Sequence, residues 1–223
     1  MNEKIFIACD SKSLKKVKKI IKETKTKKLK IGYKFGLEFL NSKKGRFFIS
    51  KLKKETIFID AKLHDIPNTM RSTIISLKDL KINYLTVHIS AGLQALKEVK
   101  KVSGKVKIVG VTTLTSLNNK NLKEIGYNKS VKNLVIHQSK LAKKANLDAV
   151  VCSAHESEYV KKIFDKEIIT PGIRLNSKSN DQKRIMTPKK AFSEKKSDWL
   201  VIGRSITKGN IKKNLENLIK HLN

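Results

Sequence analysis

The stretch TIFIDAKLHDIPNTMRSTIISLKDL, residues 56–80, predicts a β-strand followed by an α-helix. Residues 56–62 form a short run rich in β-branched and aromatic side chains, which favours a strand. Residues 69–80 suit a helix, and Asn68 or Thr69 can cap its amino end. A strand followed by a helix makes a βα unit, from which parallel sheets are built.

The same unit recurs along the whole chain. Short apolar runs alternate with amphipathic or Lys-rich stretches such as residues 13–23, and no low-complexity linker interrupts the series. Eight strands with helices between them fit a closed (β/α)8 TIM barrel better than an open doubly wound sheet, and the glycine-rich dinucleotide fingerprint is missing after the first run. The predicted strands cover residues 4–9, 29–35, 56–62, 84–89, 106–112, 148–153, 167–170 and 199–203.

Length and composition suit one α/β domain over residues 1–223, with 39% hydrophobic residues to form its core. The first residues become acidic too soon for a signal peptide, and no apolar run approaches membrane-spanning length, so we expect a cytoplasmic protein without a membrane partner. Cys9 and Cys152 each lie inside an apolar run and form no CxxC pair. We expect both cysteines to be reduced residues of the core.

The formal net charge of +31 is the most unusual feature of the composition. Such a charge raises the hypothesis of a basic nucleic-acid-binding protein. Nearly all of the positive charge is Lys spread along helical segments, whereas Arg, which contacts phosphates and base edges bidentately, is rare. We therefore expect no nucleic-acid partner and interpret the Lys excess as a solvated surface whose field attracts small anions.

Polar residues gather where the predicted strands end, which is where barrel enzymes place their chemistry. Asp60 and Lys62 are two residues apart, and such residues on a strand point to the same face. A carboxylate and an ammonium are therefore expected side by side at the barrel mouth, and Asp65 adds a third charge. Because a buried charge pair is costly, we favour a functional site over a structural ion pair. Further candidates at other strand ends are Asp10, Lys34, His88, Thr115 and Arg204.

The segment IDAKLHDIPNT, residues 59–69, resembles the signature D-x-K-x-x-D-I-x-N-T of the orotidine 5'-phosphate decarboxylase family. The resemblance covers essentially the whole chain, and the sequence departs from the family pattern mainly in the Lys-rich helices and in residues 41–48. Further matching blocks, in chain order, are residues 8–10, 34–36, 87–88, 114–116, 151–156, 170–174, 181–182 and 201–206.

The resemblance implies an enzyme without cofactor or metal, a carboxy-lyase of pyrimidine biosynthesis that converts orotidine 5'-phosphate to uridine 5'-phosphate and CO2. Loss of CO2 from ring carbon six leaves a carbanion that no ring π-system delocalises, so a cation must stabilise it. The resemblance assigns catalysis to Asp60, Lys62 and Asp65, with Lys62 as the proton donor to that carbon.

The resemblance also implies how the nucleotide is held. The three catalytic residues, Asp60, Lys62 and Asp65, would also contact the substrate. Asp10 and Lys34 would bind ribose hydroxyls, and Thr115 would contact the pyrimidine. The phosphate would lie at Arg174, Gln182, the Gly203 amide and Arg204, while Ile66, Thr69 and Pro171 complete the binding set. The resemblance further implies a homodimer in which each site takes Asp65 and Thr69 from the neighbouring subunit.

Three alternatives stay open at this point. A metal-dependent sugar-phosphate decarboxylase or aldolase of the same barrel superfamily shares D-x-K-x-x-D, although residues 67–69 and 181–182 follow the nucleotide decarboxylase pattern. The second alternative is the nucleic-acid-binding protein, and the third is an inactive barrel, which should have lost a charged site residue. His88 and His155 lack metal-ligand spacing with a carboxylate, so we expect no metal site.

Overall fold

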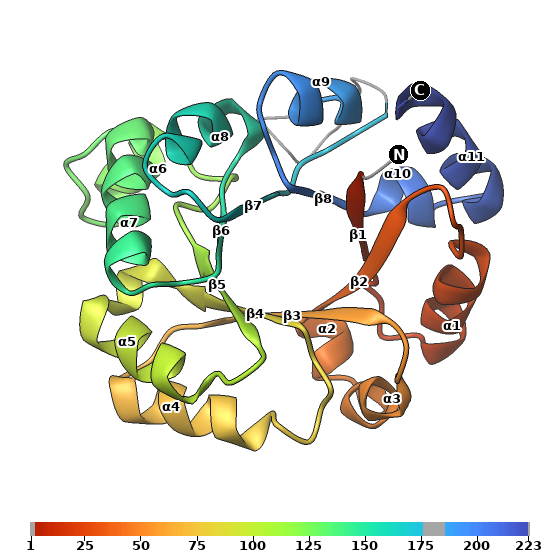
Figure 1. Ribbon diagram of the computed structural model, residues 1–223, viewed down its shortest axis with the longest axis horizontal. Coiled ribbons are helices and arrows are strands. Elements are labelled where there is room, and N and C mark those ends of the chain that lie inside the picture. The colour runs from red at the N-terminus through yellow and green to blue at the C-terminus, as the bar shows by residue number, and fades with distance from the viewer. Residues whose placement is uncertain (1–2, 176–185, 223) are drawn as a thin grey trace.

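Eight parallel strands close into a barrel in the order β1 to β8, and helices surround it (Figure 1). The computed structural model describes residues 3–175 and 186–222. Each strand overlaps one predicted run, so the predicted TIM barrel is confirmed. The strands are β1 (Lys4–Ala8), β2 (Lys30–Gly36), β3 (Thr56–Leu63), β4 (Tyr84–His88), β5 (Lys107–Val111), β6 (Ala149–Val151), β7 (Glu167–Thr170) and β8 (Trp199–Ile202).

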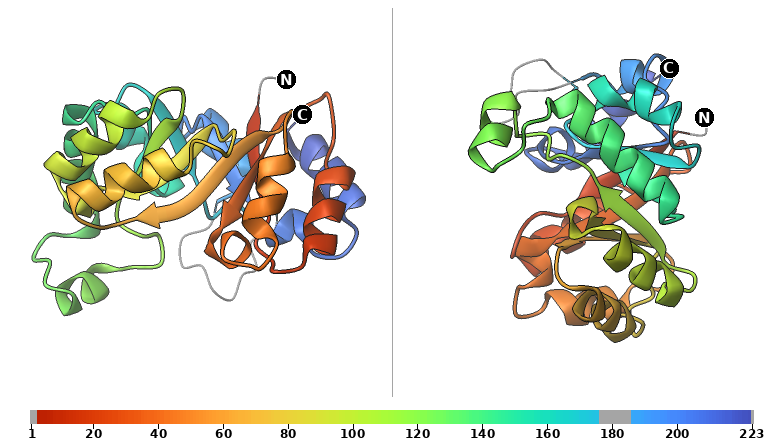
Figure 2. Two further views of the ribbon diagram at one scale, coloured as in Figure 1. Left: turned by 90° about the horizontal axis from the view of Figure 1, so that it is seen from below. Right: turned by 90° about the vertical axis from the view of Figure 1, so that its left-hand side faces the viewer.

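The helices lie on the outside, and the segment between β5 and α7 projects beyond one end of the barrel (Figure 2). The described helices are α1 (Leu14–Glu23), α2 (Leu37–Leu40), α3 (Gly45–Lys51), α4 (Pro67–Ser76), η1 (Ile89–Ala91), α5 (Leu93–Val102), α6 (Asn119–Glu124), α7 (Val131–Lys144), α8 (Ala154–Lys161), α9 (Pro188–Ser193), α10 (Arg204–Thr207) and α11 (Ile211–Leu222).

Helix α1 shows how a Lys-rich segment still packs on the barrel. Its apolar residues Val17, Ile20 and Ile21 are buried, and its lysines lie on the exposed side. The Ser13 side chain caps the helix by accepting a hydrogen bond from the Lys16 N–H at 3.3 Å. The helix predicted over residues 13–23 is therefore confirmed, and its charge is solvated as expected.

The predicted start and end of the helix after the third strand are wrong. Helix α4 begins at Pro67, and its N-cap is Ile66, not Asn68 or Thr69. Proline suits the first helical position because its fixed φ is already helical and its missing N–H has no partner there in any case. The helix ends at Ser76, and the following residues form turns instead.

Two groups of buried side chains form the core. Alternate residues such as Ile5 and Ile7 of β1 face the helices, whereas Phe6 faces the barrel interior. Inside, the Phe6 ring stacks on Trp199 at 4.0 Å between centroids and contacts Phe58 at 4.8 Å. An aromatic layer that includes the buried Trp199 therefore fills the barrel.

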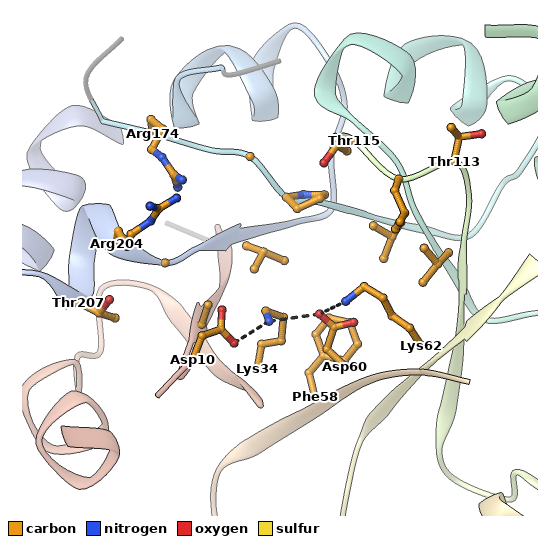
Figure 3. A pocket seen from close by; sticks show the side chains of 18 residues that line it. Asp10, Lys34, Phe58, Asp60, Lys62, Thr113, Thr115, Arg174, Arg204 and Thr207 are labelled. Atoms are coloured by element: carbon orange, nitrogen blue, oxygen red, sulfur yellow. Dashed lines mark hydrogen bonds and ion pairs between the residues drawn. The ribbon is translucent and has the colours of Figure 1, made fainter. Parts of the chain in front are cut away.

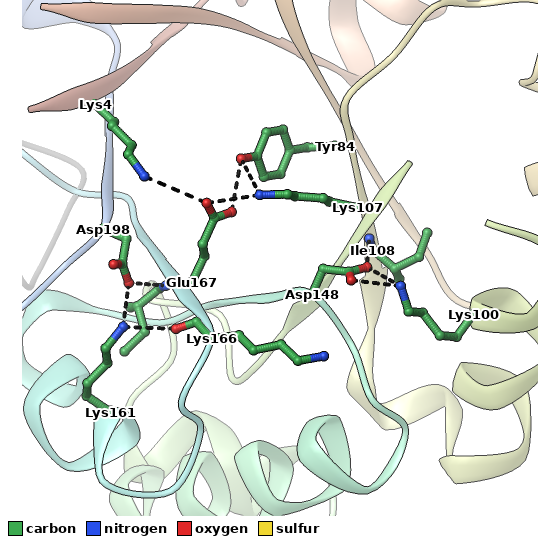
Figure 4. Close-up of polar contacts among 11 residues, drawn as sticks. Lys4, Tyr84, Lys100, Lys107, Ile108, Asp148, Lys161, Lys166, Glu167 and Asp198 are labelled. Atoms are coloured by element: carbon green, nitrogen blue, oxygen red, sulfur yellow. Dashed lines mark hydrogen bonds and ion pairs between the residues drawn. The ribbon is translucent and has the colours of Figure 1, made fainter. Parts of the chain in front are cut away.

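Charged residues join the amino ends of the strands (Figure 4). Glu167 pairs with Lys107 at 3.0 Å and accepts a hydrogen bond from the Tyr84 hydroxyl at 2.9 Å. Asp148 and Asp198 each pair with a lysine and also accept a backbone N–H, from Ile108 and Ile168 respectively, both at 2.8 Å. These carboxylates satisfy strand donors that would otherwise lack partners, which is a structural use of charge.

Cys9 and Cys152 are both buried and free, as predicted. Within residues 3–175 and 186–222, no helix combines the length and apolarity that crossing a membrane requires.

Phe6→Ala should lower the free energy of unfolding by about 3–5 kcal/mol, because it opens a cavity within the aromatic layer. Phe47→Ala is the matched control, since the Phe47 side chain is 67% exposed, and it should cost about 1 kcal/mol or less. Urea denaturation followed by far-UV circular dichroism measures both. Similar losses for the two variants would contradict the packing described for Phe6.

Candidate active site

A cavity of about 430 Å³ opens at the carboxyl ends of the strands (Figure 3). Most of the residues predicted for the site line it, although they come from six different strands or the segments after them. These lining residues are Asp10, Lys34, Asp60, Lys62, Thr115, Pro171, Arg174, Gly203 and Arg204.

Four charged side chains form a continuous alternating array along one wall of this cavity (Figure 3). Lys34 Nζ lies 3.1 Å from Asp10 Oδ1 and 3.2 Å from Asp60 Oδ2. The Lys62 ammonium lies 2.9 Å from the same Asp60 Oδ2. Lys34 and Asp60 at the centre of the array are buried, whereas Lys62 at one end is half-buried and Asp10 at the other end is exposed.

The barrel register brings this array together. Ala8 of β1 pairs with Lys34 of β2, and Gly36 of β2 pairs with Asp60 of β3, so three neighbouring strands supply the charges. Gly36 has a specific role, because a Cβ there would lie 2.7 Å from Asp10 Oδ1. Gly36 therefore leaves the space that the Asp10 carboxylate occupies beside Lys34.

The predicted pair of Asp60 and Lys62 is present, but regular strand alternation does not explain it. Pairing of β3 with β4 shifts register between Ile59 and Leu63, and Lys62 has a φ of 49°. A non-glycine residue adopts this left-handed region only at an energetic cost. An irregular strand, which spacing in the sequence does not reveal, aims the Lys62 side chain.

Burial and charge act in opposite directions on the two buried members of the array. Burial would lower the pKa of the Lys34 ammonium, but the Asp60 and Asp10 carboxylates outweigh burial and hold that pKa above its ordinary value. Burial would raise the pKa of Asp60, but Lys34 and Lys62 together hold it below its ordinary value of 3.8. Both groups therefore stay charged at neutral pH.

The other end of the cavity carries positive charge of a different kind. Arg174 follows β7, Arg204 begins α10 after β8, and their guanidinium groups point toward one another (Figure 3). Guanidinium groups match the bidentate geometry of phosphate oxygens. This end of the cavity therefore suits a phosphate group, about where barrels of this kind often bind one.

Comparison with known proteins identifies the family. Residues 3–216 match the family described as Orotidine 5'-phosphate decarboxylase / HUMPS family. The chain belongs to this family. A relative named orotidine 5'-phosphate decarboxylase from Wolbachia sp. subsp. Brugia malayi is 42% identical over 222 residues, or 96% of each chain. Another so named, from Carboxydothermus hydrogenoformans, is 38% identical over 92% of this chain and 90% of its own.

A solved structure gives the same result for the fold. The crystal structure of orotidine 5'-phosphate decarboxylase from Lactobacillus acidophilus matches with a TM-score of 0.85 and 30% identity, over 99% of each chain. Membership of the orotidine 5'-phosphate decarboxylase family confirms the resemblance that the sequence indicated.

Three residues of the family signature lie away from the cavity of their own chain. Asp65, Ile66 and Thr69 are exposed and are not among the described residues that line it. Asp65 Oδ1 accepts a hydrogen bond from the Ile66 N–H at 2.7 Å, and within one chain Asp65 does not extend the array of Asp60 and Lys62. Gln182, the remaining predicted phosphate contact, lies outside the described residues.

Several lining residues were not predicted, and most of them are apolar. Phe58, Val111, Val151 and Val201 lie on strands, where alternation of inward and outward positions could have identified them. Thr113 also lines the cavity, and its hydroxyl donates to Gln138 Oε1 at 3.1 Å. The three valines come from β5, β6 and β8, so an apolar part of the wall lies on strands other than β2 and β3, which carry Lys34, Asp60 and Lys62. The further unpredicted lining residues are Ala8, Leu114, Gly172 and Thr207.

The histidines near the strand ends are not part of the cavity lining. His88 packs beside His64 with 5.5 Å between ring centroids, and burial, His64 and Lys62 hold the pKa of His88 below its ordinary value. Within the part of the chain that the structure describes, no three His, Cys, Asp or Glu side chains group as metal ligands would.

The pKa of the Asp60 carboxyl should be measurably below 3.8 in the unliganded protein, and Lys34→Met should raise it because a counter-cation is lost while burial remains. A folded-state pKa below the unfolded value stabilises the protein above that unfolded value and loses this effect as the pH falls. The stability difference between the two proteins should therefore shrink on acidification.

Carbon-13 NMR of labelled aspartate carboxyls measures this pKa, and urea denaturation at several pH values measures stability. Lys12→Met, which removes an exposed lysine, controls for the change in net charge. An Asp60 pKa that is the same in the Lys34→Met and Lys12→Met proteins would refute the coupling between Lys34 and Asp60.

Proposed function

We propose that this chain is a cytoplasmic orotidine 5'-phosphate decarboxylase that forms uridine 5'-phosphate and CO2 in pyrimidine biosynthesis. The observation that carries the proposal is the 2.9 Å contact between the Lys62 ammonium and the Asp60 carboxylate, inside the cavity of a barrel of this family. The contact holds a cation where negative charge develops in the reaction.

The reaction breaks the bond between ring carbon six and the carboxylate, and the electron pair of that bond stays on carbon six. CO2 leaves, and no π-system of the ring takes up the electron pair. The Lys62 ammonium stabilises the developing charge and then donates a proton to carbon six. Asp60 holds this ammonium in place, and its charge disfavours the substrate carboxylate more than the transition state, where that charge is being lost.

The rest of the cavity holds the nucleotide. Asp10 and Lys34 bind ribose hydroxyls, Thr115 contacts the pyrimidine, and Ile66 and Pro171 complete its surroundings. Phosphate binding falls to Arg174, Gln182, the Gly203 amide and Arg204, at the end of the cavity where two guanidinium groups converge. Binding energy from a phosphate that does not react helps to organise the site for the transition state.

The charges of the array also distinguish this proposal from the metal-dependent alternative. Asp60 Oδ2 contacts both the Lys34 and the Lys62 ammonium groups, at 3.2 and 2.9 Å. A carboxylate oxygen shared by two ammonium groups is poorly placed to bind Mg²⁺, because Mg²⁺ needs carboxylate oxygens that are not already paired with other cations. The chemistry above uses Lys62 as its cation and needs no metal.

Lys62→Ala should lower turnover by about a thousandfold or more, because the cation and the proton donor are lost together. Lys15→Ala, at an exposed position of α1, is the control for loss of a lysine and should keep full activity. The assay follows the loss of orotidine 5'-phosphate absorbance, with and without a chelator. Equal rates in both conditions are expected, and a wild-type protein inactive in both would overturn the proposal, as would a Lys62→Ala protein with a tenth of wild-type turnover.

We further propose that the enzyme is a homodimer with shared sites, in which Asp65 and Thr69 complete the site of the neighbouring subunit. Their exposure supports this proposal, since exposed side chains are free to contact a second subunit. Both residues lie beyond the strand that carries Asp60 and Lys62. The apolar side chains of Ile66 and Ile75 beside them are 65% and 41% exposed. An interface at this face would cover these apolar groups and bring each Asp65 toward a second cavity.

Complementation tests the shared site. Lys62→Ala and Asp65→Ala should each be inactive alone, and a mixture that has been dissociated and reassembled should regain about a quarter of wild-type activity. Random pairing makes about half of the dimers mixed, and each mixed dimer holds one intact site if Asp65 acts in the neighbouring subunit. No recovery, with mixed dimers demonstrated by mass spectrometry, would exclude the shared site.

A further inference from the structure

Strand β3 departs from regular pairing at the catalytic segment. Ile59 lies opposite Leu85 and Leu63 lies opposite Val87, so the residues from Asp60 to Lys62 all face Thr86. Pairing with β4 therefore supplies few backbone hydrogen-bond partners to this segment. Within it, Lys62 has the costly left-handed φ of 49°. Another group must hold the segment in place.

The Thr86 side chain is that group. Thr86 lies on β4 and is fully buried, with 0% exposure. The Lys62 backbone N–H donates to Thr86 Oγ1 at 2.7 Å, and Thr86 Oγ1 lies 3.1 Å from Asp60 Oδ1. A hydroxyl can accept and donate at once, and because the Lys62 N–H can only donate, the hydroxyl proton is free to point at the carboxylate.

This arrangement engages both oxygens of the Asp60 carboxylate. Oδ1 accepts from Thr86, while Oδ2 faces the two ammonium groups of Lys34 and Lys62. Rotation of the carboxylate about the Cβ–Cγ bond would move both oxygens and so disrupt both sets of contacts. Thr86 therefore fixes the orientation of Asp60, and through the backbone contact it fixes the position from which the Lys62 side chain extends.

We propose that Thr86 is a positioning residue of the active site, whose one hydroxyl holds the Asp60 carboxylate and the Lys62 backbone in the arrangement needed for decarboxylation. The proposal rests on the proposed function and extends it to a residue outside the cavity lining. Its contact with a charged side chain of the array separates Thr86 from a threonine that only fills space. Misplacement of Asp60 and Lys62 affects the chemical step, whereas the phosphate contacts at the far end of the cavity stay in place.

Thr24 provides a matched control. It is also buried at 0% exposure, its hydroxyl donates to the Ile20 carbonyl at 2.7 Å, and its Oγ1 lies 3.2 Å from the Tyr33 hydroxyl. Thr24 follows α1 and does not line the cavity. Thr24→Val therefore removes a buried hydroxyl with two partners without touching the array.

Thr86→Val should lower kcat by about 10- to 100-fold, the effect of losing a charge-assisted hydrogen bond at a preorganised site, with KM changed by less than about threefold. Thr86→Ser keeps the hydroxyl and should return kcat to within about threefold of wild type. Thr24→Val should keep kcat within about twofold. A folded Thr86→Val protein with kcat within threefold of wild type would overturn the proposal, and so would a Thr86→Ser protein as impaired as Thr86→Val.

Two further measurements need no substrate. The pKa of the Asp60 carboxyl, followed by carbon-13 NMR, should rise in Thr86→Val and not in Thr86→Ser, because a donor to the ionised form is lost only in the first. An unchanged pKa in Thr86→Val would overturn the proposal. In the wild-type protein, the Lys62 amide should exchange slowly with solvent, and exchange as fast as that of an exposed amide would overturn the proposal even if Thr86→Val failed to fold.

These measurements also separate the two proposals. A wild-type protein that leaves orotidine 5'-phosphate unchanged would refute the proposed function. The amide exchange of Lys62 and the titration of Asp60 would still decide whether Thr86 holds the two residues.

Discussion

The buried carboxylate of Asp60 is the constraint on which the rest of the site depends. Removing a carboxylate from water is costly unless opposite charges and hydrogen bonds replace the lost solvent. Lys34 and Lys62 provide the charges, and because Lys34 is itself buried, Asp10 must share it. The alternating order of charge across three strands follows from that requirement, and so does the glycine at position 36, which leaves room for Asp10.

The two ends of the barrel use charge in different ways. At the amino ends, Asp148, Glu167 and Asp198 pair with lysines, and two of these carboxylates also bind strand N–H groups. Charge there joins strands to helices and, at Glu167, to one another. At the carboxyl ends, the charges line an open cavity. With 50 basic and 19 acidic residues, most lysines have no acidic partner available, and the resulting positive field favours entry of an anionic nucleotide.

The sequence predicted those features that depend on local composition. Each predicted run became a strand, and residues 13–23 formed α1 with its cap, because a few neighbouring residues decide such features. The N-cap of α4 was missed because a proline two residues earlier set the start of that helix. The register shift beside Lys62 could not be predicted, since it depends on the pairing of β3 with a strand more than twenty residues away along the chain.

The site residues divide in the same way. Asp10, Lys34, Asp60 and Lys62 stand out because charges at strand ends are unusual. The family signature names Asp60 and Lys62, and two other matching blocks contain Asp10 and Lys34. The apolar wall of Val151 and Val201 was missed because a valine on a buried strand carries no signal of its own. No local pattern distinguishes Thr86 either, since its importance arises from what the irregular part of β3 leaves without a partner.

Phe58 links the stability of the barrel to the geometry of the site. Its ring lines the cavity and also contacts Phe6 in the aromatic layer, while its backbone pairs in register with Lys34. The charged array of Asp10, Lys34, Asp60 and Lys62 is already paired in the unliganded chain. Its charges therefore need little rearrangement when a substrate binds, which is how preorganised electrostatics lower a reaction barrier. Holding like and unlike charges in this fixed order opposes folding, and the packing of the aromatic layer directly beneath them offsets that cost. A core residue such as Phe58 therefore serves catalysis by keeping the strands that carry the charged residues rigid.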